Sequence, residues 1–217
     1  MGEYRVRRSA CPATGTKINP LNTLIKDLIS GNDALAETAM NELVALGEAV
    51  FPALEELLES SDADHRWWAL SVLAQIEGAN IDWMLAGLND ESDEVRQCAA
   101  LGLSVHPNDK SIPALIKSLY DSDPMVATLS SNALAKIGES AVLPLLSVLD
   151  DNETGKKTLQ IKSAHLGAMR ALASIADPRA IPAMMTALEE NDSVFMKHWA
   201  EVGLKELGQE MVYFKTD

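Results

Sequence analysis

The stretch IPALIKSL at 112–119 decides the fold of this chain, because it returns along the sequence at a regular interval. Copies of it, some full and some partial, read LNTLIKDL at 21–28, FPALEELL at 51–58, IDWMLAGL at 81–88, VLPLLSVL at 142–149 and IPAMMTAL at 181–188. The steps between the aligned positions Asn22, Pro52, Asp82, Pro113, Pro144 and Pro182 are 30, 30, 31, 31 and 38 residues. Self-similarity at this period predicts a solenoid built from repeated supersecondary units.

A second apolar pattern follows each copy and predicts a second helix. Its main column is leucine in every repeat: Leu43, Leu73, Leu103, Leu134, Leu172 and Leu204. Four residues earlier stands a small residue: Ala39, Ala69, Ala99, Ser130, Ala168 and Ala200. Two further columns lie eight residues before the leucines, from Leu35 to Met196, and three after them, from Leu46 to Leu207. These offsets share one face of an α-helix, so each repeat is predicted to be a helix A followed by a helix B.

Turn signals fit this division of the repeat. Proline near the start of helix A costs little, because the amides of the first helical turn have no partner within the helix. Capping side chains are expected before helix B at Ser92-Asp93, Asp123-Pro124 and Asp192-Ser193. The glycines that follow helix B are expected to form left-handed C-terminal caps: Gly47, Gly78, Gly138 and Gly208.

The net charge of the chain indicates which classes of binding partner are expected. The formal net charge is −14, and the first twenty residues hold Arg5, Arg7, Arg8 and Lys17 against Glu3, so the acidic excess belongs to the repeats. Nucleic acid is disfavoured, because phosphate contacts need a basic face. The expected partner is another protein, basic or neutral in charge. The alternative is that the charge only keeps a convex face solvated.

The chain has neither an eighteen-residue apolar run nor an N-terminal apolar segment. We therefore expect no membrane span and no secretory signal. Cys11 and Cys98 do not make a disulfide framework. Reduced thiols and a cytoplasmic location are the expectation.

The repeats resemble HEAT repeats, specifically the short bacterial and archaeal kind named after the phycobilisome lyases. SDEVRQCAALGL at 92–103 and ASIADPRAIPAM at 173–184 carry the resemblance, which covers about residues 20–208. It implies an all-α, right-handed α-solenoid of about six repeats, with the first and last acting as caps. The expected divisions are a flexible tail at 1–19, repeats at about 20–47, 48–78, 79–108, 109–138, 139–177 and 178–208, and a tail at 209–217.

In such solenoids helix B lines the concave side, so the outward positions of helix B are the candidate binding surface. They mix apolar and polar side chains, as protein-binding grooves do. The candidates are Trp67, Gln97, Leu101, Asn132, Leu166, Arg170, His198 and Val202. The alternative for Trp67 and Leu166 is packing against neighbouring repeats. Trp68 and Trp199 are expected to pack at the edge of the core.

The family resemblance also implies a ladder, in which an arginine of helix B pairs with an aspartate of an adjacent turn. Arg66, Arg96 and Lys197 match the basic position, and their expected role is structural. Ala36 and Ala127 stand at the same position in other repeats, so the ladder is expected to be interrupted.

Catalytic signals are weak. The four histidines occupy separate repeats, and none has a second His or Cys at the helical spacing of a metal site. Phosphate-binding, dinucleotide-binding and nucleophile-elbow motifs do not occur. We therefore expect no catalytic residues, no metal, no cofactor and no enzymatic activity.

Three functions follow from these observations. The leading expectation is a non-enzymatic scaffold or adaptor that binds a protein partner on its concave face. The alternative, which the family's name implies, is a bilin lyase-like subunit or another chromophore-handling factor. The third is a structural or regulatory part of a larger assembly that makes contact through RVRR at 5–8 or Cys11. The extra residues at 150–160 are either a tolerated surface loop or an addition to the binding side.

Overall fold

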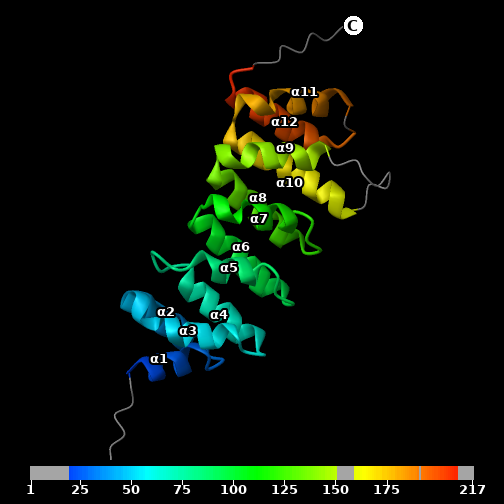
Figure 1. Cartoon of the computed structure of the whole chain (residues 1–217). Coiled ribbons are helices and arrows are strands. Elements are labelled where there is room, and N and C mark those ends of the chain that lie inside the picture. The colour runs from blue at the N-terminus through cyan, green and yellow to red at the C-terminus, as the bar shows by residue number, and fades with distance from the viewer. Residues whose placement is uncertain (1–19, 151–158, 191, 210–217) are drawn as a thin grey trace, which may run out of the picture.

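The computed structural model describes residues 20–150, 159–190 and 192–209. Within them the chain forms six pairs of α-helices that succeed one another along a single axis, from α1 at one end to α12 at the other (Figure 1). No β-strand occurs in these residues. The prediction of an all-α solenoid with about six helix pairs is confirmed.

Helix A and helix B alternate along the chain. The A helices are α1 (Pro20–Leu28), α3 (Phe51–Leu58), α5 (Ile81–Gly87), α7 (Ile112–Ser118), α9 (Val142–Asp150) and α11 (Ile181–Glu190). The B helices are α2 (Asp33–Leu46), α4 (Ala63–Leu73), α6 (Asp93–Val105), α8 (Pro124–Ile137), α10 (Leu159–Ile175) and α12 (Val194–Glu206). Short 3₁₀ turns lead into four of the A helices, at Gly47–Val50, Asp109–Ser111, Glu139–Ala141 and Pro178–Ala180.

Side-chain caps fix where the B helices begin. Ser92 Oγ accepts from the Val95 amide, Asp123 Oδ1 accepts from the Met125 and Val126 amides at 2.9 Å each, and Ser193 Oγ accepts from the Met196 amide. Each acceptor satisfies amides that the first helical turn leaves without a partner. The predicted caps at these three helix starts are confirmed.

The glycines that end the B helices correct one detail of the prediction. All four have positive φ, as expected. However, Gly47 and Gly138 combine φ of 61° and 82° with ψ of −140° and −134°, so neither adopts the left-handed helical cap. That backbone combination is open to glycine because it has no Cβ. It turns the chain directly into the 3₁₀ turn before the next helix A.

Burial follows the predicted face of helix B. Every leucine of the main column of helix B is at most 2 % exposed, and so is every small residue four places before it. The small side chains allow consecutive B helices to approach closely, and these helices contact one another more extensively than consecutive A helices do. The B helices therefore form the inner layer of the solenoid.

The predicted inward face fails at the first repeat. Leu35 and Leu46 hold inward positions in the sequence pattern but are 48 % and 49 % exposed. The matching positions of later repeats are covered by the repeat before them, and no described repeat precedes α2. The physical cause is therefore position in the stack, which the local pattern does not encode.

The buried apolar residues divide into two clusters. The larger one runs from Leu70 and Met84 to Leu204, and the smaller one runs from Leu28 to Ile76. The clusters meet along α4, where Leu70 faces one and Ala69, Val72 and Leu73 face the other.

No helix in the described part of the chain is long and apolar enough to cross a membrane. The predicted repeat boundaries stay predictions. The tail at 1–19, most of the tail at 209–217, most of the 150–160 segment, RVRR at 5–8 and Cys11 lie outside the described residues.

Candidate functional site

An arginine ladder joins the middle repeats. Arg66 on α4 donates from Nε and Nη2 to the two carboxylate oxygens of Asp90, at 2.7 Å each, and Asp90 lies in the turn between α5 and α6. Arg66 Nη1 also donates to the Ser60 carbonyl at 2.8 Å. Both side chains of the ion pair are nearly buried, with 10 % and 13 % exposed.

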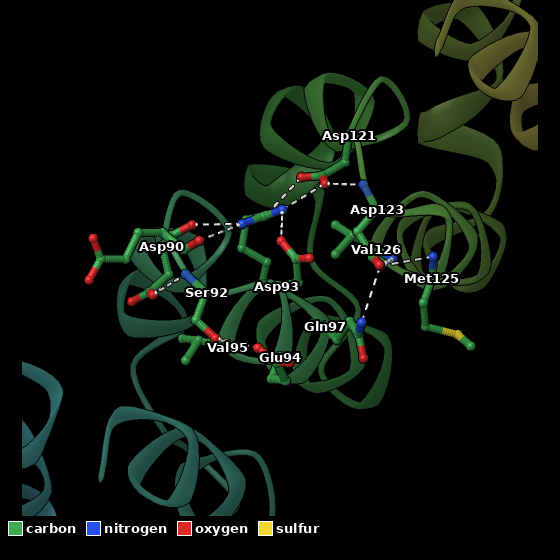
Figure 2. Close-up of polar contacts among 12 residues, drawn as sticks. Asp90, Ser92, Asp93, Glu94, Val95, Gln97, Asp121, Asp123, Met125 and Val126 are labelled. Atoms are coloured by element: carbon green, nitrogen blue, oxygen red, sulfur yellow. Dashed lines mark hydrogen bonds and ion pairs between the residues drawn. The ribbon is translucent and has the colours of Figure 1, made fainter. Parts of the chain in front are cut away.

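The next rung repeats this geometry one repeat further on (Figure 2). Arg96 on α6 donates from Nε and Nη2 to Asp121 at 2.9 Å each, and Asp121 lies in the turn between α7 and α8. Arg96 also pairs with Asp93 at 2.7 Å and donates to the Asp90 carbonyl at 3.0 Å. Bidentate guanidinium–carboxylate pairs fix geometry as well as charge, so the predicted structural role of Arg66 and Arg96 is confirmed.

The rungs shift the pKa values of their members. The hydrogen bond from Arg66 holds the pKa of Asp90 below its ordinary value. Burial alone would raise the pKa of Asp121, but hydrogen bonds from Arg96 and from the Asp123 amide outweigh it, so this pKa is also lowered. Lys197, the third predicted member, forms no such ion pair among the described residues.

The ladder stops after α6 for a reason visible in the sequence. Asp90 and Asp121 each lie five residues before the first inward residue of helix B, and the same position holds Ser60 in the second repeat and Leu159 in the fifth. The residues that would pair with Ser60 and Leu159 are Ala36 and Ala127, at the position that holds Arg66 and Arg96 in the second and third repeats. The arginine and the aspartate of an ion pair are therefore absent together at these two places.

A hollow occupies the place where the Ala127–Leu159 rung would be. It has two parts, and Ser163 and Leu166 line both of them. The larger part has a volume of about 360 Å³ and is bordered by Asp121 and Pro124, by Leu159 to Ser163 on α10, and by Ser193. The smaller part, of about 80 Å³, lies between α8, α10 and α12 and is lined by Thr128, Gly167, Arg170 and Trp199. We call the two parts together the inner hollow.

Arg170 is the charged group of the smaller part. Its Nη2 donates to the Thr128 carbonyl at 2.6 Å and to Asn132 Oδ1 at 3.1 Å. Its buried Nε has no hydrogen-bond partner among the described residues. Burial lowers the pKa of this guanidinium, and no described carboxylate offsets that effect. The hollow thus contains a cation without a counter-ion, beside the apolar surfaces of Leu166 and Trp199.

Exposed apolar side chains lie at or next to one side of the larger part. The first turns of α8, α10 and α12 carry Met125, Leu159, Val194 and Phe195, and Leu159 is 81 % exposed. These three helices pack side by side (Figure 1). The border of the larger part therefore has one apolar side at these helix starts, which we call the apolar rim. Its other border residues include Asp121, Gln160 and Lys162, and Arg170 lines the smaller part.

The structure brings three of the eight predicted site residues together. Asn132, Leu166 and Arg170 meet between α8 and α10. Trp67 lies apart on α4, where it packs on the larger core cluster and meets Trp68 edge to face. Gln97 donates to Asp123 Oδ1 at 3.1 Å and so supports the cap of α8 (Figure 2).

The remaining predicted residues do not line the inner hollow. Leu101 and His198 are exposed and Val202 is half-buried. Conversely, the sequence pattern assigned Trp199 to packing, yet it both contacts the core and lines the smaller part of the hollow. Ser163 was not singled out, because serine at a helix surface carries no distinctive signal. The sequence feature that could have indicated this hollow is the replacement of the ladder arginine and aspartate by Ala127 and Leu159.

Other groups offer less chemistry. Cys98 is buried, its Sγ lies 3.3 Å from Ser71 Oγ, and burial raises the pKa of its thiol, so it is not a ready nucleophile. His106, which caps the end of α6, is half-buried, and its Nε2 lies 2.9 Å from the carbonyl of Ala74 at the end of α4. No group of three potential metal ligands occurs in the described residues. A wider pocket of about 570 Å³ between α5 and α7 is spanned by the Lys117–Asn89 hydrogen bond.

Family models match two parts of the chain. HEAT repeats match residues 81–158, and the PBS lyase HEAT-like repeat matches residues 166–190. These matches confirm that the chain contains HEAT repeats, as its sequence predicted. Its repeats include the PBS lyase HEAT-like kind, and that segment begins at Leu166 and contains Arg170.

The similar proteins of known function are named for the phycobilisome or its bilin. The chain is 33 % identical over 106 residues to the phycobilisome maturation protein of Synechococcus elongatus, which covers 49 % of this chain and 47 % of the relative. It is 34 % identical over 97 residues to the phycocyanobilin lyase subunit beta of Nostoc sp., which covers 45 % of this chain and 44 % of the relative. The matches thus span about half the length of these relatives.

Two solved structures are similar to this chain. The complex of CpcE and CpcF of phycocyanin lyase from Nostoc sp. PCC7120 matches with a TM-score of 0.54 and 27 % identity, over 72 % of this chain and 64 % of that chain. An engineered protein matches with a TM-score of 0.50 and 20 % identity, over 88 % of this chain and 97 % of that chain, and this match shows the fold alone.

These comparisons correct two predictions. The leading expectation, a non-enzymatic scaffold or adaptor, is wrong, because the relatives are named as lyase subunits and as a maturation protein of the phycobilisome. The expectation of a non-enzyme is contradicted by the same names. The error arose because the catalytic motifs sought were those of unrelated folds, and the fold itself does not specify a function.

Proposed function

We propose that this chain is a bilin-handling subunit of the phycocyanobilin lyase kind, which binds an open-chain tetrapyrrole at the inner hollow. The observation that carries the proposal is the position of the hollow. It interrupts the arginine ladder in the inner layer, and the segment that matches the PBS lyase HEAT-like repeat supplies Leu166 and Arg170 to it.

The chemistry of the hollow suits this class of ligand. A bilin is a flat, conjugated, mostly apolar molecule with charged carboxylate side chains. Ligand sites for such molecules are lined mainly by apolar and aromatic groups, with a few placed polar groups that fix orientation. Leu166 and Trp199 supply apolar surface, and Ser163, Thr128 and Arg170 supply the polar groups.

A protein partner belongs to the same proposal. The phycocyanin lyase structure that this chain resembles is a complex of two different chains. The net charge of −14 favours a partner surface that is neutral or basic over one that is acidic. The exposed apolar rim, with Leu159 and Phe195, is a surface on which such a partner could close the hollow.

Titration with phycocyanobilin tests the proposal. We expect the wild-type chain to change the visible absorbance of the bilin and to induce circular dichroism in it. Ser163→Trp should abolish both signals, because Ser163 lines both parts of the hollow and the indole would take up space there. Leu166→Glu should do the same by placing a like charge beside the bilin carboxylates.

Leu143→Glu is the matched control. Leu143 is an exposed leucine on α9, 60 % accessible and outside the inner hollow. The Leu143→Glu variant should bind the bilin as the wild type does. Far-UV circular dichroism should show that all three variants are folded. The proposal fails if the wild-type chain gives no spectral change, or if both hollow variants bind as well as Leu143→Glu.

A further inference from the structure

Arg170 differs from the other arginines of the described chain in having no carboxylate partner. Arg66 binds Asp90, Arg96 binds Asp93 and Asp121, and Arg179 binds Asp177 and Glu139. Arg170 bonds only to a backbone carbonyl and to the side-chain amide of Asn132. Neither acceptor carries a charge.

The free donors of Arg170 are well placed for an anion. Nε is buried without a partner, and Nη1 makes no hydrogen bond to the described residues. Nη2 is held from the side of α8 by Thr128 and Asn132, which fixes the guanidinium plane, and Nε is the buried donor left without a partner among the described residues. A partly buried cation held in this way is destabilised until an anion pairs with it.

The surroundings restrict what kind of anion fits. The smaller part of the hollow has a volume of only about 80 Å³ and is walled by Leu166, Gly167 and Trp199. It admits a small, planar acceptor on an apolar body more readily than a large polyanion. A guanidinium fork matches the geometry of a carboxylate, because two parallel N–H groups meet two oxygens.

We propose that Arg170 binds a propionate carboxylate of the bilin and so sets its orientation, with the carboxylate in the smaller part of the hollow. The pyrrole rings then extend past Leu166 into the larger part, toward the apolar rim around Leu159. This inference rests on the proposed function. It adds a residue for binding and orientation, and assigns no covalent step to it.

Esterification of the ligand tests the inference without changing the protein. The wild-type chain is titrated with phycocyanobilin and with its dimethyl ester, which keeps the chromophore but removes the carboxylate charge. We expect the free acid to bind about tenfold or more tightly, as loss of a charge-assisted pair implies. Arg170→Gln should weaken binding of the free acid and leave the ester unchanged, so the ratio of the two affinities falls toward one.

Arg179→Gln is the charge-matched control, because Arg179 is exposed and lies outside the inner hollow. It should retain the wild-type ratio. Arg170→Lys should restore part of the ratio, because it keeps the charge without the fork. Equal affinity of the wild type for acid and ester, or an unchanged ratio in Arg170→Gln, would overturn this inference and leave the proposed function standing. Binding of neither compound by the wild type would overturn both.

Discussion

Arg96 is the residue on which the middle of the solenoid depends most directly. We expect Arg96→Ala to lower the free energy of unfolding by about 3 kcal/mol, because it leaves the nearly buried Asp121 carboxylate without its partner. Lys110→Ala is the matched control, since it removes the Lys110–Asp82 pair, whose side chains are 59 % and 54 % exposed. That change should cost at most about 1 kcal/mol, because water screens exposed pairs.

Urea denaturation followed by circular dichroism measures both variants. A similar cost for Arg96→Ala and Lys110→Ala would mean that the rung adds no more than a surface ion pair. A double-mutant cycle of Arg96→Ala with Asp121→Asn isolates the coupling between the two side chains.

The ladder also predicts how stability responds to acid. Asp90 and Asp121 have lower pKa values in the folded chain than in the unfolded chain. Their contribution is therefore complete above the ordinary aspartate pKa of about 3.9, and it is lost as pH falls from there through the folded values. Unfolding free energies measured between neutral pH and pH of about 3 should decrease in that window. Asp121→Asn should flatten the decrease, and an unchanged profile would contradict the assignment.

At the scale of helices, glycine decides how closely α12 approaches α10. A Cβ on Gly203 would lie 2.5 Å from Met184 Cε and 2.9 Å from the backbone Cα of Ala173. We expect Gly203→Ala to destabilise the chain by about 1–3 kcal/mol through overpacking, because backbone cannot move aside locally. Thermal unfolding by circular dichroism measures the effect.

Gly167 on α10 provides the comparison. A Cβ there would meet Leu119 Cδ2 at 3.1 Å, which is the end of a flexible side chain. The clash is small, and alanine gains up to about 1 kcal/mol of helix propensity over glycine. Gly167→Ala should therefore leave stability unchanged or raise it. If both substitutions had the same effect, helix propensity and not the α10–α12 contact would control stability.

At the scale of the whole molecule, the two core clusters predict two regions of different cooperativity. Leu134→Ala, in the larger cluster, should cost about 2–5 kcal/mol through a cavity and should reduce amide hydrogen-exchange protection from α6 to α12. Leu43→Ala, in the smaller cluster, should reduce protection only from α1 to α4. Each variant should affect mainly its own region, because a repeat in a solenoid is stabilised by contacts with its immediate neighbours. A uniform loss in both variants would show that the solenoid unfolds as one unit.

Sequence patterns were enough to predict the fold, the helix pairs and, outside the first repeat, the buried face of helix B. Proline, cap residues and the leucine and alanine columns act within one repeat or between adjacent repeats, so a local pattern was enough to predict them. The family resemblance predicted the structural role of Arg66 and Arg96, and it offered the lyase-like function as an alternative.

Which outward residues come together could be seen only in the tertiary structure. Asn132 and Arg170 are 38 positions apart but share a hydrogen bond, and Trp199 on a third helix lines the same hollow as Arg170, because α10 packs against both α8 and α12. The state of Arg170, half-buried and without a counter-ion, depends on side chains from different repeats. Burial and charge pairing are properties of that packed surface, and therefore no single repeat of the sequence could reveal them.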